Sequence, residues 1–530
     1  MYYRPELERC PKCEGKLKRS HTRWQKTIQF LGGASQIYNQ AYRCADETCY
    51  ETNPVVYSSV YADGLSLPYR TYGFDVIVYI GYQRQHEHRT IPELHQTLVK
   101  GYGVQISERE VLYLFDEYLV LSACSHGKRL AKYQDEIAAN GGIVLGIDGA
   151  KPEKGQPGLY IFRDALSGCR LHCALLPSAD QASLSRELEV VKGLGLTVQA
   201  IISDDERAIV AAVAETFPDV PHGLCHLHFL KAVQKPVYTQ DQQLAKELKR
   251  PLRRLSQVER VVTQQPEQTA MLSDDQQEAL RRYLDAMRAV LLTKGQAPFR
   301  LAGLTIYESL THLADSLARA LATHDHVLLE PLRAMADAHI SQHESYAQVL
   351  AQQAWFLGLA DLLNVARTEH FGWSTLTGAE VAQAVDEYLE ELARLQDELP
   401  LDAPFFAHMR RRLLQWAPGL FWTYEIDALP RTNNALEADI GDIKEQYRRI
   451  TGRRSLKDYL MRYGPDLAFD DDNDDPEELF LWFQSVDREL YLSEKQKLQA
   501  LRERLRNMQR FRSQPDDFLP ETERLWNSPD

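Results

Sequence analysis

The sequence lacks any run of about 18 consecutive apolar residues, the length that a membrane-spanning helix needs. Its polar start, Met1-Tyr-Tyr-Arg-Pro-Glu, also lacks the apolar segment of a secretory signal. We therefore expect no membrane span and a cytoplasmic protein. No internal repeat is visible, and the only biased tract is the acidic run at 470–478. With 44% hydrophobic and 26% charged residues among 530, the chain is neither a collagen, a coiled-coil rod nor a wholly disordered protein.

Positive charge is scarce, because 61 Lys and Arg face 75 Asp and Glu and leave a formal net charge of -14. This balance argues against a basic coat protein for nucleic acid. The charge is uneven, however: residues 1–132 carry 17 Lys and Arg against 14 Asp and Glu. A mildly basic front on an acidic body allows contact with nucleic acid through the front.

Half of the eight cysteines lie in residues 1–56, as the two close pairs Cys10/Cys13 and Cys44/Cys49. Four thiolates suit a tetrahedral zinc ion, and a module of about 50 residues has too little core to fold unaided. The alternative is four unrelated reduced cysteines. We expect one structural Zn²⁺ here, because four protein ligands leave no position for a substrate.

Residues 57–138 have the pattern of a helix-turn-helix. A helix starting near Ile91 is broken at Gly101-Tyr-Gly-Val, and Ser107 followed by Glu110 then forms a capping box for a second helix. This second helix would read the major groove. The cations that could contact the phosphates are Arg84, Arg89, Lys100 and Arg109. Two ordinary packed helices are the alternative interpretation.

Residues 139–235 change to short apolar runs that alternate with helical stretches, which indicates a mixed α/β sheet. Asp148 closes the first of these runs, and Asp204 closes a later one, so we expect each of them at the end of a strand. Residues 236–429 have the composition of an all-helical block. A further helix from about 433 to 450 carries an apolar stripe and, on its flank, Glu437. The stripe consists of Leu436, Ile440, Ile443, Tyr447 and Ile450.

Three such acids suit phosphoryl transfer with two Mg²⁺ (or Mn²⁺) ions, since hard divalent cations prefer carboxylate oxygens. Each acid also has an ordinary interpretation. Asp148 precedes a glycine as a turn residue would, and Asp204 and Glu437 both fit capping positions at helix starts. The adjacent Asp205 leaves open which of the two aspartates is the ligand. The combination and order of the three acids favour the catalytic interpretation.

Four segments together resemble the DDE transposases of the Mutator-like (MULE) type. They are Asp148 after its apolar run, Ile201-Ile-Ser-Asp204, Cys225-His-Leu-His228, and Arg431-Thr-Asn-Asn-Ala-Leu-Glu437. The resemblance covers about 141–235 and 430–455. It implies an RNase H-like mixed sheet interrupted by a large all-α insertion, with a zinc ribbon and a helix-turn-helix in front. It also implies that Asp148, Asp204 and Glu437 bind the catalytic metals.

This family interpretation divides the chain into six parts. They are a zinc ribbon (1–56), a helix-turn-helix domain (57–138), the first part of the catalytic core (139–235), the insertion (236–429), the Glu-bearing helix (430–465), and an acidic linker with a helical tail (466–530). The charge of this tail predicts that it is peripheral. Cys225 and His228 are expected in the structural core, although a metal site is the alternative. The cations expected at DNA, besides Arg109, are Lys444, Arg448, Arg449, Arg453 and Arg454; a solvated charge run is the alternative for the four arginines.

The expected activity is that of a DNA transposase acting on terminal inverted repeats and target DNA, in a homodimer or larger assembly. In a bacterium it would be associated with the nucleoid. Two alternatives are a domesticated, non-catalytic DNA-binding regulator and an RNase H-like nuclease that cuts without joining.

Overall fold

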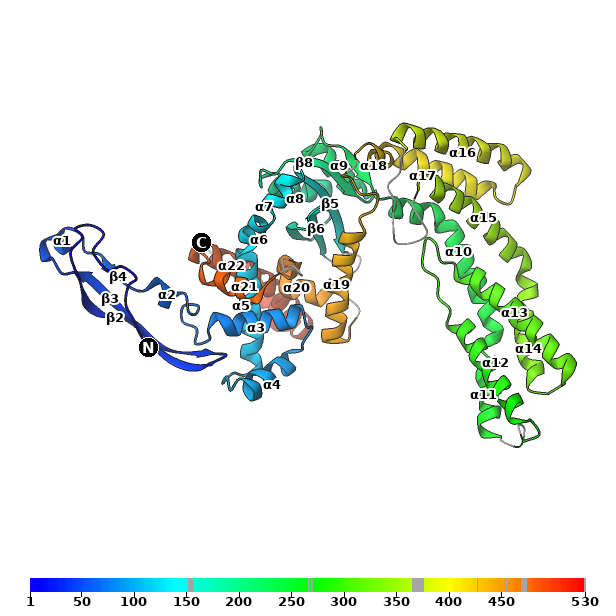
Figure 1. Cartoon of the computed structure of the whole chain (residues 1–530), viewed down its shortest axis with the longest axis horizontal. Coiled ribbons are helices and arrows are strands. Elements are labelled where there is room, and N and C mark those ends of the chain that lie inside the picture. Colours follow the sequence, from blue (N-terminus) through cyan, green and yellow to red (C-terminus); the bar gives the residue numbers. More distant parts are fainter. Residues whose placement is uncertain are drawn as a thin grey trace. The chain divides into compact units, whose positions relative to one another are not determined.

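The computed structural model describes residues 1–530 except 151–156, 266, 268–269, 365–375, 427, 454–455, 469–473 and 529–530. The chain forms two compact units (Figure 1). The first consists of 1–199, 211–218 and 434–530, and the second of 200–210 and 219–433. The division passes through strand β8 (Val198–Ser203) and helix α9 (Arg207–Thr216). Among the described residues, no helix is long and apolar enough to cross a membrane.

A long two-stranded ribbon dominates the N-terminal part of the first unit. Strands β2 (Leu17–Phe30) and β3 (Gly33–Cys44) pair antiparallel, and the short strands β1 (Tyr2–Tyr3) and β4 (Val56–Tyr57) add to β3. Gly33 has a φ of +113° at the turn, a conformation that glycine adopts without steric cost. A small apolar cluster of Ile28, Ile37 and Leu65 stabilises the turn end of the ribbon. The short helices α1 (Glu47–Thr52) and α2 (Val60–Asp63) flank it.

The expected pair of helices is present as α4 (Ile91–Gly101) and α5 (Glu108–Cys124), beside α3 (Phe74–Gln85). Half of the expected capping box is present at the start of α5, because the Ser107 hydroxyl accepts the N–H of Glu110 at 3.2 Å. The complete box is found at the start of α4, between Thr90 and Glu93. Every residue of α5 from Leu114 to Ser122 is buried. The exposed residues of α5 therefore all lie in its first two turns. The short helices α6 (His126–Lys132) and α7 (Gln134–Ala139) follow.

The second sheet confirms the mixed α/β prediction, with strand order β7-β6-β5-β8-β9. Strands β5 (Ile143–Ala150), β6 (Gly158–Asp164) and β7 (Arg170–Leu176) pair antiparallel, whereas β8 and β9 (His222–Leu224) pair parallel. Helix α8 (Gln181–Lys192) packs on β7, and α19 (Asn434–Thr451) packs on β5 (Figure 1). One apolar core joins this sheet to α3, α4, α5 and α19.

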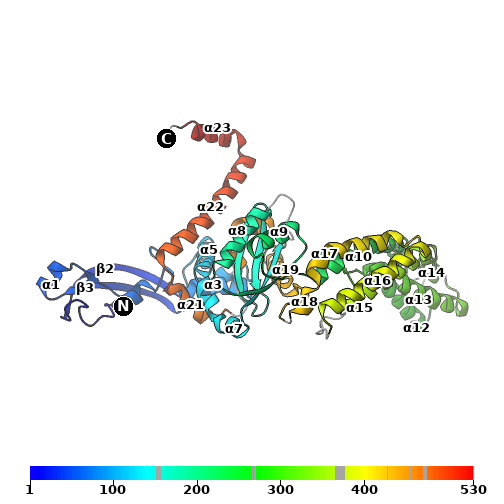
Figure 2. The same ribbon diagram turned by 90° about the horizontal axis from the view of Figure 1, so that it is seen from above.

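The second unit is helical, as expected for 236–429. Helices α13, α15 and α17 pack against α10, the longest helix of the unit (Figure 2). Its helices are α10 (His226–Leu252), α11 (Leu255–Gln264), α12 (Asp274–Leu292), α13 (Ala302–Thr323), α14 (Leu329–Asp337), a 3₁₀ turn (Ala338–Gln342), α15 (His343–Leu362), α16 (Gly378–Glu398), α17 (Ala403–Leu420) and α18 (Trp422–Glu425).

The C-terminal segment differs from the peripheral tail that its charge suggests. Helix α20 (Lys457–Tyr463) and a 3₁₀ turn (Gly464–Ala468) are followed by α21 (Pro476–Gln484), α22 (Arg488–Ser513) and α23 (Pro515–Trp526). Helix α21 packs on α3 and the first half of α22 on α5, burying Leu479 and Phe483. Just before α21 in the chain, Asp474 of the acidic run forms a buried ion pair with Arg129 at 2.6 Å. Of the helices described in this segment, α23 alone has no buried residue.

Candidate functional site

The four N-terminal cysteines converge at the open end of the ribbon. Cys10 and Cys13 lie in a turn, Cys44 ends β3, and Cys49 lies in α1. Their sulfur atoms all lie within 4.8 Å of one another, and those of Cys13 and Cys44 are 3.4 Å apart. Four sulfurs about 2.3 Å from a tetrahedral Zn²⁺ are about 3.8 Å from each other. The cluster therefore fits a structural metal such as zinc, and the prediction that these four cysteines meet is confirmed.

The thiols differ in how readily they ionise. Hydrogen bonds from backbone N–H groups, first that of Lys12, lower the pKa of Cys10 to about 7. The hydrogen bond between Cys49 and Cys13 contributes most to raising the pKa of Cys49 to about 12. Four sulfurs at this spacing cannot all ionise without a compensating cation, which a divalent metal would provide.

Asp148 lies within β5, opposite Ile161 of β6. The expectation that it ends the strand is wrong by two residues, because the ladder with β6 continues to Ala150. Gly149 fits a strand position against the ring of Tyr160, where a Cβ atom would lie only 2.6 Å from the ring. The Asp148 carboxylate is partly exposed and accepts the N–H of Gly149 at 2.7 Å.

Helix α19 is seated as its sequence predicts. Leu436, Ile440, Ile443 and Tyr447 are each at most 6% exposed, and the helix contacts β5. Glu437 lies in the first turn and is partly exposed. Two of the three predicted acids, Asp148 and Glu437, thus stand on two elements that pack together within the first unit.

An acid that the sequence analysis missed fastens α19 to the sheet. Asp439 forms ion pairs with Arg163 of β6 at 2.6 Å and with Arg170 of β7 at 3.3 Å. Its side chain is only 10% exposed. At the other end of the helix, the Gln446 amide donates to the backbone carbonyl of Gln85 at 3.0 Å. The only signal in the sequence was a second acid two residues after Glu437, which has no distinctive spacing.

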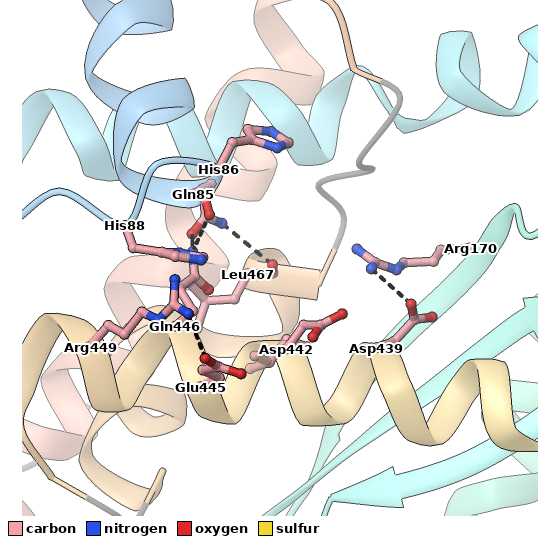
Figure 3. Close-up of a pocket in the computed structure, with 11 residues that line it drawn as sticks. Gln85, His86, His88, Arg170, Asp439, Asp442, Glu445, Gln446, Arg449 and Leu467 are labelled. Atoms are coloured by element: carbon pink, nitrogen blue, oxygen red, sulfur yellow. Dashed lines mark hydrogen bonds and ion pairs between the residues drawn. The ribbon is translucent and has the colours of Figure 1, made fainter.

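A pocket of about 280 Å³ lies beside α19, along the stretch from Asp439 to Arg449 (Figure 3). Arg449 lines it and pairs with Glu445 at 2.7 Å. At about 100° per residue, Arg449 is about 120° around the helix from Glu437, whereas Lys444 and Arg448 are within about 20° of it. Lys444 and Arg448 are both exposed. Lys444 and Arg448 therefore lie on the same flank of the helix as Glu437, while Arg449 faces the pocket.

Asp204 belongs to the second unit and directly follows β8, as expected. Its carboxylate accepts the N–H of Glu206 at 3.2 Å, which forms a short turn before α9. The neighbouring Asp205 carboxylate accepts a hydrogen bond from Gln415, and burial raises its pKa. Asp148 and Glu437 belong to the first unit, whereas Asp204 belongs to the second.

The Cys225 segment lies at the start of α10. Cys225 is fully buried, and its sulfur accepts the N–H of Asn433 at 3.4 Å. His228 is partly buried in the first turn. The adjacent His226, which the sequence analysis did not single out, is fully buried and bonds the carbonyl of Leu420 at 2.8 Å. Burial lowers the pKa of His226 to about 4, so its imidazole is neutral at pH 7.

The remaining cations are exposed side chains of the first unit. The Arg109 guanidinium donates to the hydroxyl of Tyr113 at 2.9 Å and stacks over its ring. Arg453 is exposed just beyond α19, and Arg454 lies outside the described residues. No protein-family model matches this chain, and no curated protein matches it.

Proposed function

We propose that this protein is a DNA transposase that binds the terminal inverted repeats of its element and performs metal-dependent strand cleavage and strand transfer. The observation that carries the proposal is the seating of α19 on β5. Glu437 and Asp148 lie on these two packed elements, and Lys444 and Arg448 lie on the same flank of α19 as Glu437. In this proposal the second sheet is an RNase H-like core, and the helical second unit interrupts it before the Glu-bearing helix.

Asp148, Asp204 and Glu437 would hold two Mg²⁺ (or Mn²⁺) ions. Their carboxylate oxygens suit these hard cations, and Asp148 and Glu437 are partly exposed, as metal ligands that meet a substrate must be. The bound metals would supply charge stabilisation for an in-line displacement at phosphorus. The exposed ammonium of Lys444 and guanidinium of Arg448 would orient the DNA strand through its phosphates. Asp439 would act indirectly, by holding α19 against β6 and β7.

The front of the chain would bind the ends of the element. A zinc-bound Cys10/Cys13/Cys44/Cys49 cluster would stiffen the open end of the ribbon, and α4 with α5 would act as a helix-turn-helix. Because α5 is buried from Leu114 to Ser122, base contacts would come from its first turns, which include Arg109. Two ends must be joined, so we propose a homodimer or larger assembly on duplex DNA.

The test uses DNA cloned from either side of the gene, where a transposon has short inverted repeats. A labelled fragment with these repeats is incubated with the protein, MgCl₂ or MnCl₂ and a supercoiled target plasmid, and joined products are counted. Asp148→Ala, Asp204→Ala and Glu437→Ala should each reduce joining at least about 100-fold and leave DNA binding within about threefold. Asp442→Ala is the matched control, since Asp442 is an exposed acid of the same helix.

Four results would overturn the proposal or parts of it. Binding that needs no metal, with no cleavage of any flanking end, would favour a domesticated DNA-binding regulator. Nicks without joined products would favour an RNase H-like nuclease. Full joining by one of the three variants would remove that residue from the catalytic set, and loss of joining in Asp205→Ala but not in Asp204→Ala would exchange the two aspartates.

A further inference from the structure

A second groove of the first unit, of about 570 Å³, lies where the start of α4, the start of α5, the end of α19 and helix α20 meet. None of its lining residues belongs to the second unit. The groove is lined by Arg84, Ile91, Arg109, Tyr447, Arg453 and Arg462, among others. It thus joins the proposed DNA-reading helices to the end of the proposed catalytic helix.

The charge of the groove is opposite to that of the chain. Its charged lining residues are four arginines and one acid, Glu108, whereas the whole chain has a net charge of -14. Arg109, Arg453 and Arg462 are exposed. Such a concentration of one sign in a concave surface favours an anionic ligand.

Arg84 is the least expected of these cations because it is only 5% exposed. One terminal nitrogen donates to the carbonyl of Arg89 at 3.2 Å, and the guanidinium lies 4.9 Å from the ring centre of Phe115. Within the described part of the chain, its Nε atom has no hydrogen-bond partner and no carboxylate lies within 4.0 Å of it. A buried charge without a counter-ion is costly, and an anion in the groove would offset that cost.

Three tyrosine rings also line the groove. The ring centres of Tyr447 and Tyr459 are 4.8 Å apart, and those of Tyr459 and Tyr463 are 5.0 Å apart. The guanidinium of Arg462 lies 5.3 Å from the ring centre of Tyr463. Stacking on a ring limits the freedom of an arginine side chain while leaving its N–H groups available to phosphate oxygens.

We infer that this groove binds phosphate groups of the duplex DNA backbone. The inference rests on the proposed function, which it deepens by adding Arg84 and Arg462 to the DNA contacts. Three of the four arginines are exposed and come from different elements, which suits a row of phosphates better than one small phosphorylated molecule. A strand held there would contact α5 and α19 together and fix the distance from the element end to the cleavage position.

The test measures binding of a fluorescein-labelled 30-base-pair duplex by anisotropy at several salt concentrations, without divalent metal. The double variant Arg109→Gln/Arg462→Gln changes two exposed side chains, so the fold should persist. We expect at least tenfold weaker binding at about 0.1 M salt and a salt slope smaller by about 2. The matched control is Arg504→Gln/Arg506→Gln, which removes two exposed arginines of α22.

The outcomes separate the groove from the catalytic proposal. Weaker binding in the groove variant alone supports the groove, even if no DNA is ever cut and the transposase proposal fails. Equal loss in both variants, or none in either, overturns the groove even if the wild-type protein joins DNA. Competition with pyrophosphate and ATP forms a third arm. Displacement of the duplex at micromolar pyrophosphate or ATP would overturn the DNA assignment in favour of a small phosphorylated ligand.

Discussion

The two candidate metal sites differ in how the chain supplies their ligands. All four cysteines come from residues 10–49 and meet at one end of a single ribbon. The carboxylates come from residues 148, 204 and 437, and they are divided between two compact units. The first site is therefore a local structure, whereas the second depends on long-range packing. The difference shows that spacing in the sequence predicts a ligand set directly only when the ligands share one short element.

The two sites also differ in what else stabilises their surroundings. The apolar cluster of the ribbon, Ile28, Ile37 and Leu65, lies toward the turn and away from the cysteines. Helix α19, in contrast, buries an apolar stripe and a doubly paired carboxylate, and neither set of contacts includes a metal. We therefore expect the metal to control folding at the cysteine site but not at the carboxylate site.

The largest expected effect follows from removing one cysteine ligand. Cys44→Ser should abolish zinc binding and open the end of the ribbon, because structural zinc contributes about 10 kcal/mol or more to folding. Hydrogen exchange should accelerate at least 100-fold at residues 17–22 and 40–44. Exchange near Ile28 and Ile37 should change less than threefold, because their apolar cluster remains. Zinc content measured by atomic absorption should fall from one ion per chain to none.

The control is Cys124→Ser, which changes a cysteine of α5 outside the cluster and should retain the zinc. If Cys44→Ser kept one zinc ion per chain and full protection, the cluster would not be a structural metal site. Uniform loss of protection along the ribbon would instead mean that the metal and the apolar cluster form one cooperative unit.

The sequence predicted local features well. The stripe of α19, the cap at Ser107 and the position of Asp204 after β8 all follow from residue periodicity or from hydrogen-bonding chemistry within a few residues. The ion pairs of Asp439 with Arg163 and Arg170 join residues about 270 positions apart, and no periodicity connects them. The burial of α21 was missed for a related reason: the charged residues that precede it suggested solvent, whereas Asp474 pairs with the buried Arg129.

The second prediction tests the ion pairs that hold α19 against strands β6 and β7. Asp439→Asn should cost about 3 kcal/mol of unfolding free energy, because it leaves two largely buried guanidinium groups without their carboxylate. The cost should appear in urea denaturation of the full chain. Zinc content should not change, since no cysteine is involved.

Asp442→Asn provides the comparison, since it removes an exposed carboxylate of the same helix and should cost less than about 0.5 kcal/mol. A loss below 1 kcal/mol in Asp439→Asn would mean that the apolar stripe alone seats α19. The distinction matters for the proposed function, because a loosened α19 should reduce strand joining even though every proposed metal ligand is still present.

The last prediction separates the two units by how their stability responds to acid. In the second unit, burial lowers the pKa of both His222 and His226 to about 4, and in the first unit it does so for His126. In the unfolded chain, histidine has a pKa of about 6.5, so the unfolded state binds more protons between pH 6.5 and 4. The stability that these histidines contribute is complete above pH 6.5 and falls by about 1.4 kcal/mol per histidine per pH unit toward pH 4.

The second unit should consequently lose protection more steeply than the first when hydrogen exchange is followed from pH 6.5 to 4.5, after correction for intrinsic exchange rates. Burial also lowers the pKa of His408 in the second unit, which adds to this difference. Burial raises the pKa of Asp241 in the second unit, which acts in the opposite direction, so the decisive quantity is the difference between wild type and His226→Asn. This substitution should reduce the slope of the second unit by about 1.4 kcal/mol per pH unit and leave that of the first unchanged. An unchanged slope in the second unit would mean that His226 does not contribute to the acid sensitivity of that unit. Equal changes of slope in both units would mean that the two units unfold together. The division of the three carboxylates between two units would then have no consequence for stability.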